Sequence, residues 1–272
     1  MAIKLSDLVI TTDIDGTLLH APHSIPRRNI EAIERFTKKG GRFAIASGRS
    51  IESARQYAKL LPINMPCILF NGSGIYDYDS EKLLYGSYLP DTYRVYTETI
   101  LSQFPTIGAI LLNQKEMYSV SDLHYSEKYL GIEKQPFIAS DLDSLEGDFF
   151  KLILSMDAQM IAQVDAFTAS QGWEDVTFVR SSPNFFEMLP SGINKGTGLQ
   201  HLVDCIGVSI EQTVSIGDYY NDFEMLQTAA FPATVKDAPD DIKEICKLVT
   251  GGCMDGAVAD LIEHLEETYP LA

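Results

Sequence analysis

The sequence has little positive charge. Its 272 residues include 21 Lys and Arg against 38 Asp and Glu, which gives a formal net charge of −17 at pH 7. The electrostatic field of such a surface repels a phosphate backbone. The charge balance therefore argues against nucleic acid as a partner.

Long apolar runs are missing as well. No stretch approaches the roughly 20 apolar residues that a bilayer-spanning helix requires, and the first residues form no extended apolar signal segment. With 45% hydrophobic and 22% charged residues, the chain has enough apolar side chains for a substantial core. We expect a globular, cytoplasmic protein of about two domains without membrane contact. The sequence does not indicate an oligomeric state.

Cysteine is scarce. The four cysteines lie far apart, lack the CxxC spacing of a zinc site, and stand mostly within apolar runs: Cys67, Cys205, Cys246 and Cys253. This distribution argues against a disulfide framework or a zinc centre. It predicts buried free thiols.

Short apolar runs alternate with helix-period segments at both ends of the chain. An amphipathic helix follows Ser24, and a second helix follows Ser50, each serine being a predicted helix cap. The predicted strands around these and later helices cover residues 8–12, 42–46, 66–70, 213–216, 232–235 and 248–250. This alternation predicts an α/β fold with a doubly wound, Rossmann-like parallel sheet that has helices on both faces.

The middle of the chain has a different pattern. Two strand pairs, each separated by a polar turn, and two helices are predicted in it: strands 109–112 with 117–120 and 176–180 with 185–189, and helices 92–104 and 158–169. Antiparallel pairs with a layer of helices describe an α+β unit. We therefore predict that residues 85–189 form a domain inserted into the sheet domain of residues 1–84 and 190–272.

Two carboxylates follow the first predicted strand, in the segment Asp13-Ile14-Asp15-Gly16-Thr17. Side chains alternate along extended backbone, so Asp13 and Asp15 lie on the same side. Two neighbouring carboxylates on the same side of a strand repel each other unless a cation or a shared proton compensates their charge. The alternative is an Asp-Gly turn with two solvated carboxylates.

Two further segments have features that suit a phosphate group. Ser47-Gly48-Arg49 follows the second strand, where a hydroxyl and free backbone N–H groups can hold phosphate oxygens. Lys195 stands at a helix start, where the helix dipole disfavours a cation, so an anion is expected beside it. The alternatives are an ordinary loop before the Ser50 cap and a solvated lysine.

A fourth segment, Gly217-Asp218-Tyr219-Tyr220-Asn221-Asp222, follows the strand that ends at residue 216. Taken alone, its carboxylates are also compatible with capping of the next helix. However, open α/β sheets bind their ligands at the carboxyl ends of their strands. Four such segments, each at a strand end, therefore predict one shared site.

In order and composition these four segments resemble the motifs of the haloacid dehalogenase superfamily of phosphatases. Three further segments resemble the Cof-type branch of that superfamily: Asn71-Gly72, Glu187-Met188-x-Pro190 and Asp255-Gly256-Ala257-Val258. The branch carries a large α+β cap between its second and third motifs, which implies that residues 85–189 are such a cap. The resemblance covers essentially the whole chain.

The resemblance implies hydrolysis of small phosphomonoesters, such as sugar phosphates, through an aspartyl-phosphate. Asp13 is then the nucleophile, and Asp15 is the acid that protonates the leaving oxygen and later the base that activates water. The implied cofactor is Mg²⁺, bound by Asp13, Asp15 through its backbone carbonyl, and Asp218, with Asp222 in support.

The resemblance also implies a set of phosphate-binding residues. Lys195 neutralises the phosphoryl oxygens, and Asn221 orients either Lys195 or the phosphate. The complete expected set is Thr17, Ser47, Gly48, Asn71, Lys195 and Asn221. In the inserted domain Lys115, Lys151 and Arg180 are candidate anion contacts, although solvated surface charges are the preferred interpretation.

Two other functions share these motifs. A phosphomutase keeps the phosphoryl group and transfers it to a second hydroxyl. A phospho-acceptor signalling domain also uses clustered aspartates and a lysine, but it needs neither the inserted domain nor an acid and base such as Asp15. We therefore expect an enzyme, and a small phosphorylated metabolite as its ligand.

Overall fold

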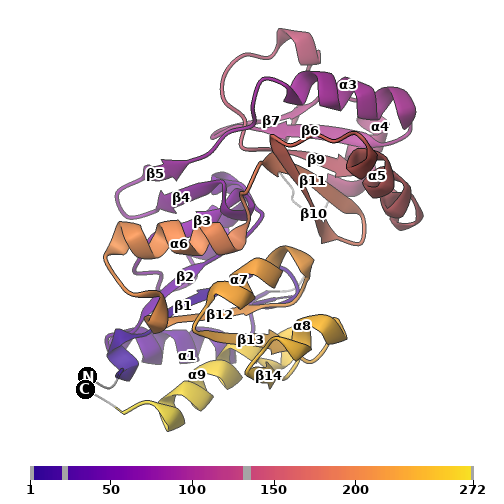
Figure 1. Ribbon diagram of the computed structural model, residues 1–272. Coiled ribbons are helices and arrows are strands. Elements are labelled where there is room, and N and C mark those ends of the chain that lie inside the picture. Colours follow the sequence, from indigo (N-terminus) through magenta and orange to yellow (C-terminus); the bar gives the residue numbers. More distant parts are fainter. Residues whose placement is uncertain (1–2, 20–23, 131–135, 271–272) are drawn as a thin grey trace. The chain divides into compact units, whose positions relative to one another are not determined.

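The computed structural model describes residues 3–19, 24–130 and 136–270 (Figure 1). The chain divides into two compact units. The first comprises Met1–Arg49, Ala54–Tyr85 and Asn194–Ala272, and the second comprises Ser50–Ser53 and Gly86–Ile193. The main divisions thus fall after Tyr85 and Ile193, whereas the sequence placed them after residues 84 and 189.

The first unit contains a five-stranded sheet in the order β14-β13-β12-β1-β2. Every neighbouring pair of these strands is parallel. The strands are β1 (Val9–Thr12), β2 (Arg42–Ile45), β12 (Thr213–Gly217), β13 (Phe231–Val235) and β14 (Leu248–Thr250). All four residues of β1 are buried, as expected for a β-branched run in the middle of a parallel sheet. The predicted parallel sheet is confirmed.

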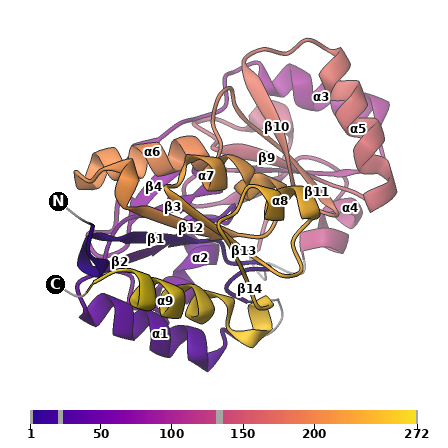
Figure 2. The same ribbon diagram turned by 60° about the horizontal axis from the view of Figure 1, so that its bottom comes forward.

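Helices cover both faces of this sheet (Figures 1 and 2). On one face α1 (Arg27–Lys38) lies beside α9 (Ala257–Thr268), and on the other α6 (Lys195–Ile206) lies beside α7 (Phe223–Thr228). The unit also contains the short helix α8 (Asp240–Glu244), and α2 (Ile51–Ala58) follows β2 in the chain. The doubly wound arrangement predicted from the sequence is therefore present.

Two predictions about the first helices have different outcomes. Ser24 does not cap α1: the N-cap position is Pro26, which makes no side-chain hydrogen bond. Proline fixes its own φ near the helical value and has no N–H to satisfy, so a helix begins readily beside it without a polar cap. Ser50 does cap α2, because its Oγ accepts a hydrogen bond from the backbone N–H of Ser53 at 3.2 Å.

The predicted strand at residues 66–70 belongs to a second sheet. β3 (Cys67–Leu69) pairs antiparallel with β4 (Gly74–Asp77), and β5 (Lys82–Gly86) completes a three-stranded sheet. One parallel bridge, between Ala46 and Ile68, joins β3 to the end of β2. The chain reverses after β3 because three consecutive residues have positive φ, at 52°, 56° and 99°: Phe70, Asn71 and Gly72.

The second unit is built on a six-stranded sheet in the order β10-β11-β9-β6-β7-β8. Both predicted hairpins are confirmed as the antiparallel pairs β6–β7 and β10–β11. The strands are β6 (Gly108–Leu112), β7 (Met117–Ser119), β8 (Ile138–Ala139), β9 (Lys151–Ser155), β10 (Val176–Ser182) and β11 (Phe185–Pro190). The unit thus has the predicted α+β character.

One apolar cluster joins this sheet to its two long helices, α3 (Tyr93–Gln103) and α5 (Ala158–Ser170). Ile100 of α3, Leu152 of β9 and Val164 of α5 are completely buried in it. Neither α4 (Leu123–Leu130) nor β8 was expected from the sequence pattern. Both residues of β8 are exposed, so the strand leaves no alternating pattern in the sequence.

The cysteines are free thiols, but only one of the four is buried. Cys67 lies within β3, Cys246 and Cys253 are half-buried, and Cys205 is exposed. The prediction of burial was therefore wrong for Cys205, which lies on the outward side of α6 despite its apolar neighbours in the sequence. Within the described ranges of the chain, every helix is too short or too polar to cross a membrane.

Candidate active site

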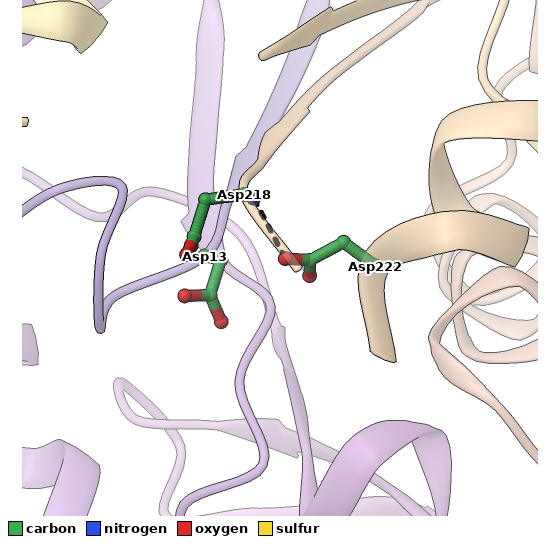
Figure 3. Close-up of side chains that lie close together, drawn as sticks. All are labelled: Asp13, Asp218 and Asp222. Carbon is green, nitrogen blue, oxygen red and sulfur yellow. Dashed lines mark hydrogen bonds between the residues drawn. The ribbon is translucent and has the colours of Figure 1, made fainter. Parts of the chain in front are cut away.

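Three carboxylates converge beyond the ends of the central strands β1 and β12. Asp13 directly follows β1, and its backbone N–H donates to the carbonyl of Ile216 in β12 at 2.9 Å. Asp218 directly follows β12, and Asp222 stands just before α7. In Figure 3 the carboxylates of Asp13, Asp218 and Asp222 lie close together, and one oxygen of each is within 4.8 Å of the others.

The position of Asp218 is fixed by the turn that follows Asp13. The hydroxyl of Thr17 donates to Oδ1 of Asp218 at 2.7 Å. Gly16 has φ of 97°, and a Cβ at this position would lie 2.3 Å from Oδ2 of Asp218. Only glycine fits so close to the carboxylate with this backbone conformation. The hydroxyl proton of Thr17 is thus used by Asp218, and the expected contact of Thr17 with phosphate stays a prediction.

Lys195 lies between two of these carboxylates. It is completely buried, and its Nζ donates to Oδ1 of Asp13 at 2.5 Å and to Oδ1 of Asp222 at 2.6 Å. It is the first residue of α6, whose N-cap is Asn194. Burial by itself lowers the pKa of Lys195, but the two carboxylates outweigh it and raise the pKa above its ordinary value. The ammonium group therefore stays charged, beside the anions expected from its place at a helix start.

Both oxygens of Asp222 are already engaged. Oδ1 accepts from Lys195, and Oδ2 accepts from the backbone N–H of Tyr219 at 3.2 Å. Oδ2 also accepts from the backbone N–H of Asp218 at 2.9 Å (Figure 3). The side chain of Asp222 is almost fully buried. A carboxylate held in this way acts as a rigid acceptor that orients Lys195 and the loop after β12.

The cluster carries more negative than positive charge. Burial raises the pKa of Asp13 from an ordinary value of 3.8 to about 7, with Lys195 opposing the rise and Asp222 and Asp15 adding to it. Burial, together with the charges of Asp13 and Asp222, raises the pKa of Asp218 well above its ordinary value. Buried carboxylates that resist ionisation fit a site for a hard divalent cation, which prefers oxygen ligands and supplies the missing charge.

This charge imbalance predicts a pH-dependent effect of Mg²⁺ on stability. The folded-state pKa of Asp13 is above its unfolded value of 3.8. Without metal, the stability that protonated Asp13 contributes is therefore fully present below pH 3.8 and is lost as the pH rises to about 7. Mg²⁺ should reverse the loss, adding about 3 kcal/mol at a hundredfold excess over its Kd. Thermal unfolding with Mg²⁺ or with a chelator should therefore differ clearly at pH 8 and little at pH 5. Equal unfolding midpoints at pH 8 would exclude this metal site.

The Ser47-Gly48 loop forms a second part of the site. The carbonyl of Ser47 accepts from the backbone N–H of Asn71 at 3.1 Å, and the amide of Asn221 donates to Oδ1 of Asn71 at 3.1 Å. A Cβ on Gly48 would lie 2.8 Å from the same Oδ1. Ser47, Gly48, Asn71 and Asn221 are thus packed together, and the amide N–H of Asn221 is used by Asn71.

Arg49, for which the sequence motifs indicated no role, pairs with Asp15. Nε of Arg49 donates to Oδ2 of Asp15 at 2.6 Å, and Nη2 donates to Oδ1 at 2.8 Å. The sequence does contain a signal for this pair. Asp15 follows β1 and Arg49 follows β2, and these parallel strands are neighbours with Thr12 opposite Ile45. Opposite charges in two loops at the same edge of the sheet could therefore have predicted the pair.

The candidate cations of the inserted unit differ from one another. Lys151 is buried, with its Nζ 2.6 Å from a carboxylate oxygen of Glu187, so the expectation of a solvated surface charge was wrong for it. It lies on β9 beside β11, which carries its partner. Lys115 is exposed in the turn between β6 and β7, as expected. Arg180 is partly buried in β10, and its Nε donates to the carbonyl of Ser182 at 3.4 Å.

Known proteins are similar to this chain in sequence and in fold. The family of haloacid dehalogenase-like hydrolases matches residues 10–262. The 5-amino-6-(5-phospho-D-ribitylamino)uracil phosphatase YwtE of Bacillus subtilis is 27% identical over 281 residues, which cover 94% of this chain and 97% of YwtE. The crystal structure of a haloacid dehalogenase-like hydrolase from Bacteroides thetaiotaomicron has a TM-score of 0.83 and 25% identity, with 95% and 99% of the two chains covered.

A second solved structure supports the same fold. The sugar phosphatase BT4131, of subclass IIB of the superfamily, has a TM-score of 0.81 at 21% identity, with 94% of this chain and 98% of its own covered. The family match spans both units of the chain. The chain therefore belongs to the haloacid dehalogenase-like hydrolase family, as a Cof-type phosphatase that hydrolyses phosphoric monoesters.

Proposed function

We propose that this phosphatase hydrolyses small phosphorylated metabolites with the help of Mg²⁺, through a phosphoryl group carried transiently on Asp13. The observation that carries the proposal is the buried ion pair of Asp13 with Lys195, at 2.5 Å, next to Asp218 and Asp222. A nucleophile needs a fixed orientation and a cation beside the charge that develops on the phosphoryl oxygens. Lys195 supplies both.

Asp13, Asp218 and the backbone carbonyl of Asp15 are the groups that would hold Mg²⁺. Asp222 is better suited to hold Lys195, because its two oxygens already accept hydrogen bonds from Lys195 and from two backbone N–H groups. When bound, the cation neutralises the carboxylates and polarises a phosphoryl oxygen. Thr17 contributes by holding Asp218 at 2.7 Å in the orientation that the cation requires.

The reaction proceeds in two displacements. A carboxylate oxygen of Asp13 attacks phosphorus, the bond to the leaving oxygen breaks, and that oxygen keeps the electron pair and takes a proton from Asp15. Water then attacks phosphorus and gives a proton to Asp15, while the bond between phosphorus and the Asp13 oxygen breaks. This step releases inorganic phosphate and restores the carboxylate of Asp13. Ser47, the backbone of Gly48 and Lys195 hold the equatorial oxygens during both steps.

The names of relatives support a small phosphorylated substrate. Three Bacillus subtilis relatives, at 22–27% identity, are named 5-amino-6-(5-phospho-D-ribitylamino)uracil phosphatases. One structural neighbour is named a sugar phosphatase. A phosphate ester on a sugar or a sugar alcohol is common to these names, and we propose this class for the present enzyme. The unit inserted between Gly48 and Lys195 in the sequence is proposed to be its cap.

A panel of phosphate esters tests the proposal. Sugar phosphates, ribitol phosphates, nucleotides, pyridoxal phosphate and flavin mononucleotide are incubated with the enzyme, with Mg²⁺ or with an excess of chelator, and free phosphate is measured. We expect release from one or more sugar or sugar-alcohol phosphates only with Mg²⁺. Release that chelation leaves unchanged would contradict the proposed mechanism, and formation of a sugar bisphosphate would indicate a phosphomutase.

A further inference from the structure

The carboxylate of Asp15 is held by a guanidinium fork. Arg49 donates to both oxygens, at 2.6 and 2.8 Å, and the two donors are Nε and Nη2. The two partners differ in exposure: the side chain of Arg49 is 5% exposed, whereas that of Asp15 is 43% exposed. A bidentate pair fixes the plane of the carboxylate as well as its distance. Arg49 is thus the fixed partner, and Asp15 faces the solvent side of the site.

The backbone of Arg49 is anchored on both sides. Its N–H donates to Oγ of Ser47 at 3.2 Å, and its carbonyl accepts from the backbone N–H of Phe70 at 3.1 Å. Its guanidinium carbon lies 5.2 Å from the centre of the Tyr57 ring, within the range of a cation–π contact. These contacts connect Arg49 to the phosphate loop and to the reversal after β3.

We propose that Arg49 is the positioning residue for Asp15 in the reaction described above, on which this inference rests. A carboxylate has about four lone-pair sites, and the fork uses two of them, so each oxygen keeps one for a proton. Arg49 holds one of those oxygens toward the leaving oxygen during the first displacement. It acts through Asp15 and touches neither the phosphoryl group nor the leaving group.

The leaving group provides a readout for this role. A leaving oxygen that is stable as an anion needs little help from an acid, whereas a basic one needs a well-placed proton donor. The value of kcat/KM reports the first displacement. A misplaced Asp15 therefore lowers kcat/KM only for substrates with basic leaving groups. Loss of a contact to the phosphoryl group, in contrast, lowers kcat/KM equally for all leaving groups.

The experiment measures kcat/KM of the Mg²⁺-loaded enzyme with 4-nitrophenyl phosphate, phenyl phosphate and a primary alkyl phosphate. For Arg49→Gln we expect a loss of less than about threefold with the first ester and about a hundredfold with the other two. Arg49→Lys, which keeps the charge but not the fork, should give an intermediate loss with the same dependence. In Arg49→Ala, guanidinium ion at a non-denaturing concentration should restore activity toward phenyl phosphate.

Arg55→Gln is the matched control. Arg55 also pairs with a carboxylate, that of Glu81 at 3.2 Å, and lies over an aromatic ring, that of Tyr78 at 5.4 Å, but its partner is exposed. This variant should show wild-type values with all three esters. A uniform loss in the Arg49 variants, or none, would overturn the inference while the wild-type enzyme remains an Mg²⁺-dependent phosphatase. A wild type without such activity would instead contradict the proposed function itself.

Discussion

Replacement of Asp13 by asparagine is expected to lower kcat/KM for phosphate release by at least about 10⁴-fold. The amide is a poor nucleophile and cannot form an acyl phosphate. The change keeps the size of a side chain that is only 5% exposed and removes a charge that burial already disfavours. Folding should therefore be retained, and the loss should be chemical.

The measurement compares phosphate release with circular dichroism and thermal unfolding of the same preparation. Asp240→Asn is the matched control, because Asp240 is also an aspartate paired with a lysine but its side chain is 96% exposed. The control should have wild-type activity. Activity of Asp13→Asn within about tenfold of the wild type would exclude Asp13 as the nucleophile, whatever its effect on stability.

Replacement of Lys195 by methionine should have the second largest effect. The variant loses the cation that contacts both Asp13 and Asp222, so kcat/KM should fall by at least about a hundredfold. It also leaves two buried carboxylates without their partner, which costs about 3 kcal/mol or more of stability. The loss of activity and the loss of stability both follow from the loss of the two ion pairs of Lys195.

The pH dependence separates charge from packing in this variant. Without Lys195 the pKa of Asp13, already about 7, rises further, because Lys195 opposes the effect of burial. The part of the destabilisation that comes from Asp13 should therefore be small at pH 5, where its carboxyl is protonated, so the total destabilisation should be larger at pH 8. Lys243→Met, which removes a partly exposed lysine paired with Asp240, should be neutral at both pH values. A destabilisation of Lys195→Met that is equal at pH 5 and pH 8 would show that the charge of Asp13 makes no contribution to it.

Sequence patterns were sufficient for the parallel sheet and its helices. Buried β-branched runs such as residues 9–12, each followed by a helix-period segment, leave few other arrangements. They were not sufficient for the second sheet of the same unit. The turn there has positive φ at Phe70, which no local preference signals, and the turn signal of Asn71-Gly72 was not used, so β4 and β5 remained unpredicted.

Only part of the site could be predicted from the sequence. Topology alone brings Asp13 and Asp218 together, because β1 and β12 are adjacent parallel strands. The residues that hold those groups were not predictable in the same way. Thr17 bonds Asp218 across 201 positions, and such a pair depends on rotamers that a motif does not specify.

The most direct test of the account is whether Asp13 carries the phosphoryl group during turnover. A substrate with a labelled phosphate is mixed with the Mg²⁺-loaded wild type, quenched in acid within the first turnover and at later times, and the labelled residue is identified by mass spectrometry. We predict that label on Asp13 forms before labelled free phosphate is released. The label should then decay as fast as free phosphate accumulates. Turnover without label on Asp13, or label that persists for minutes without further turnover, would contradict the account.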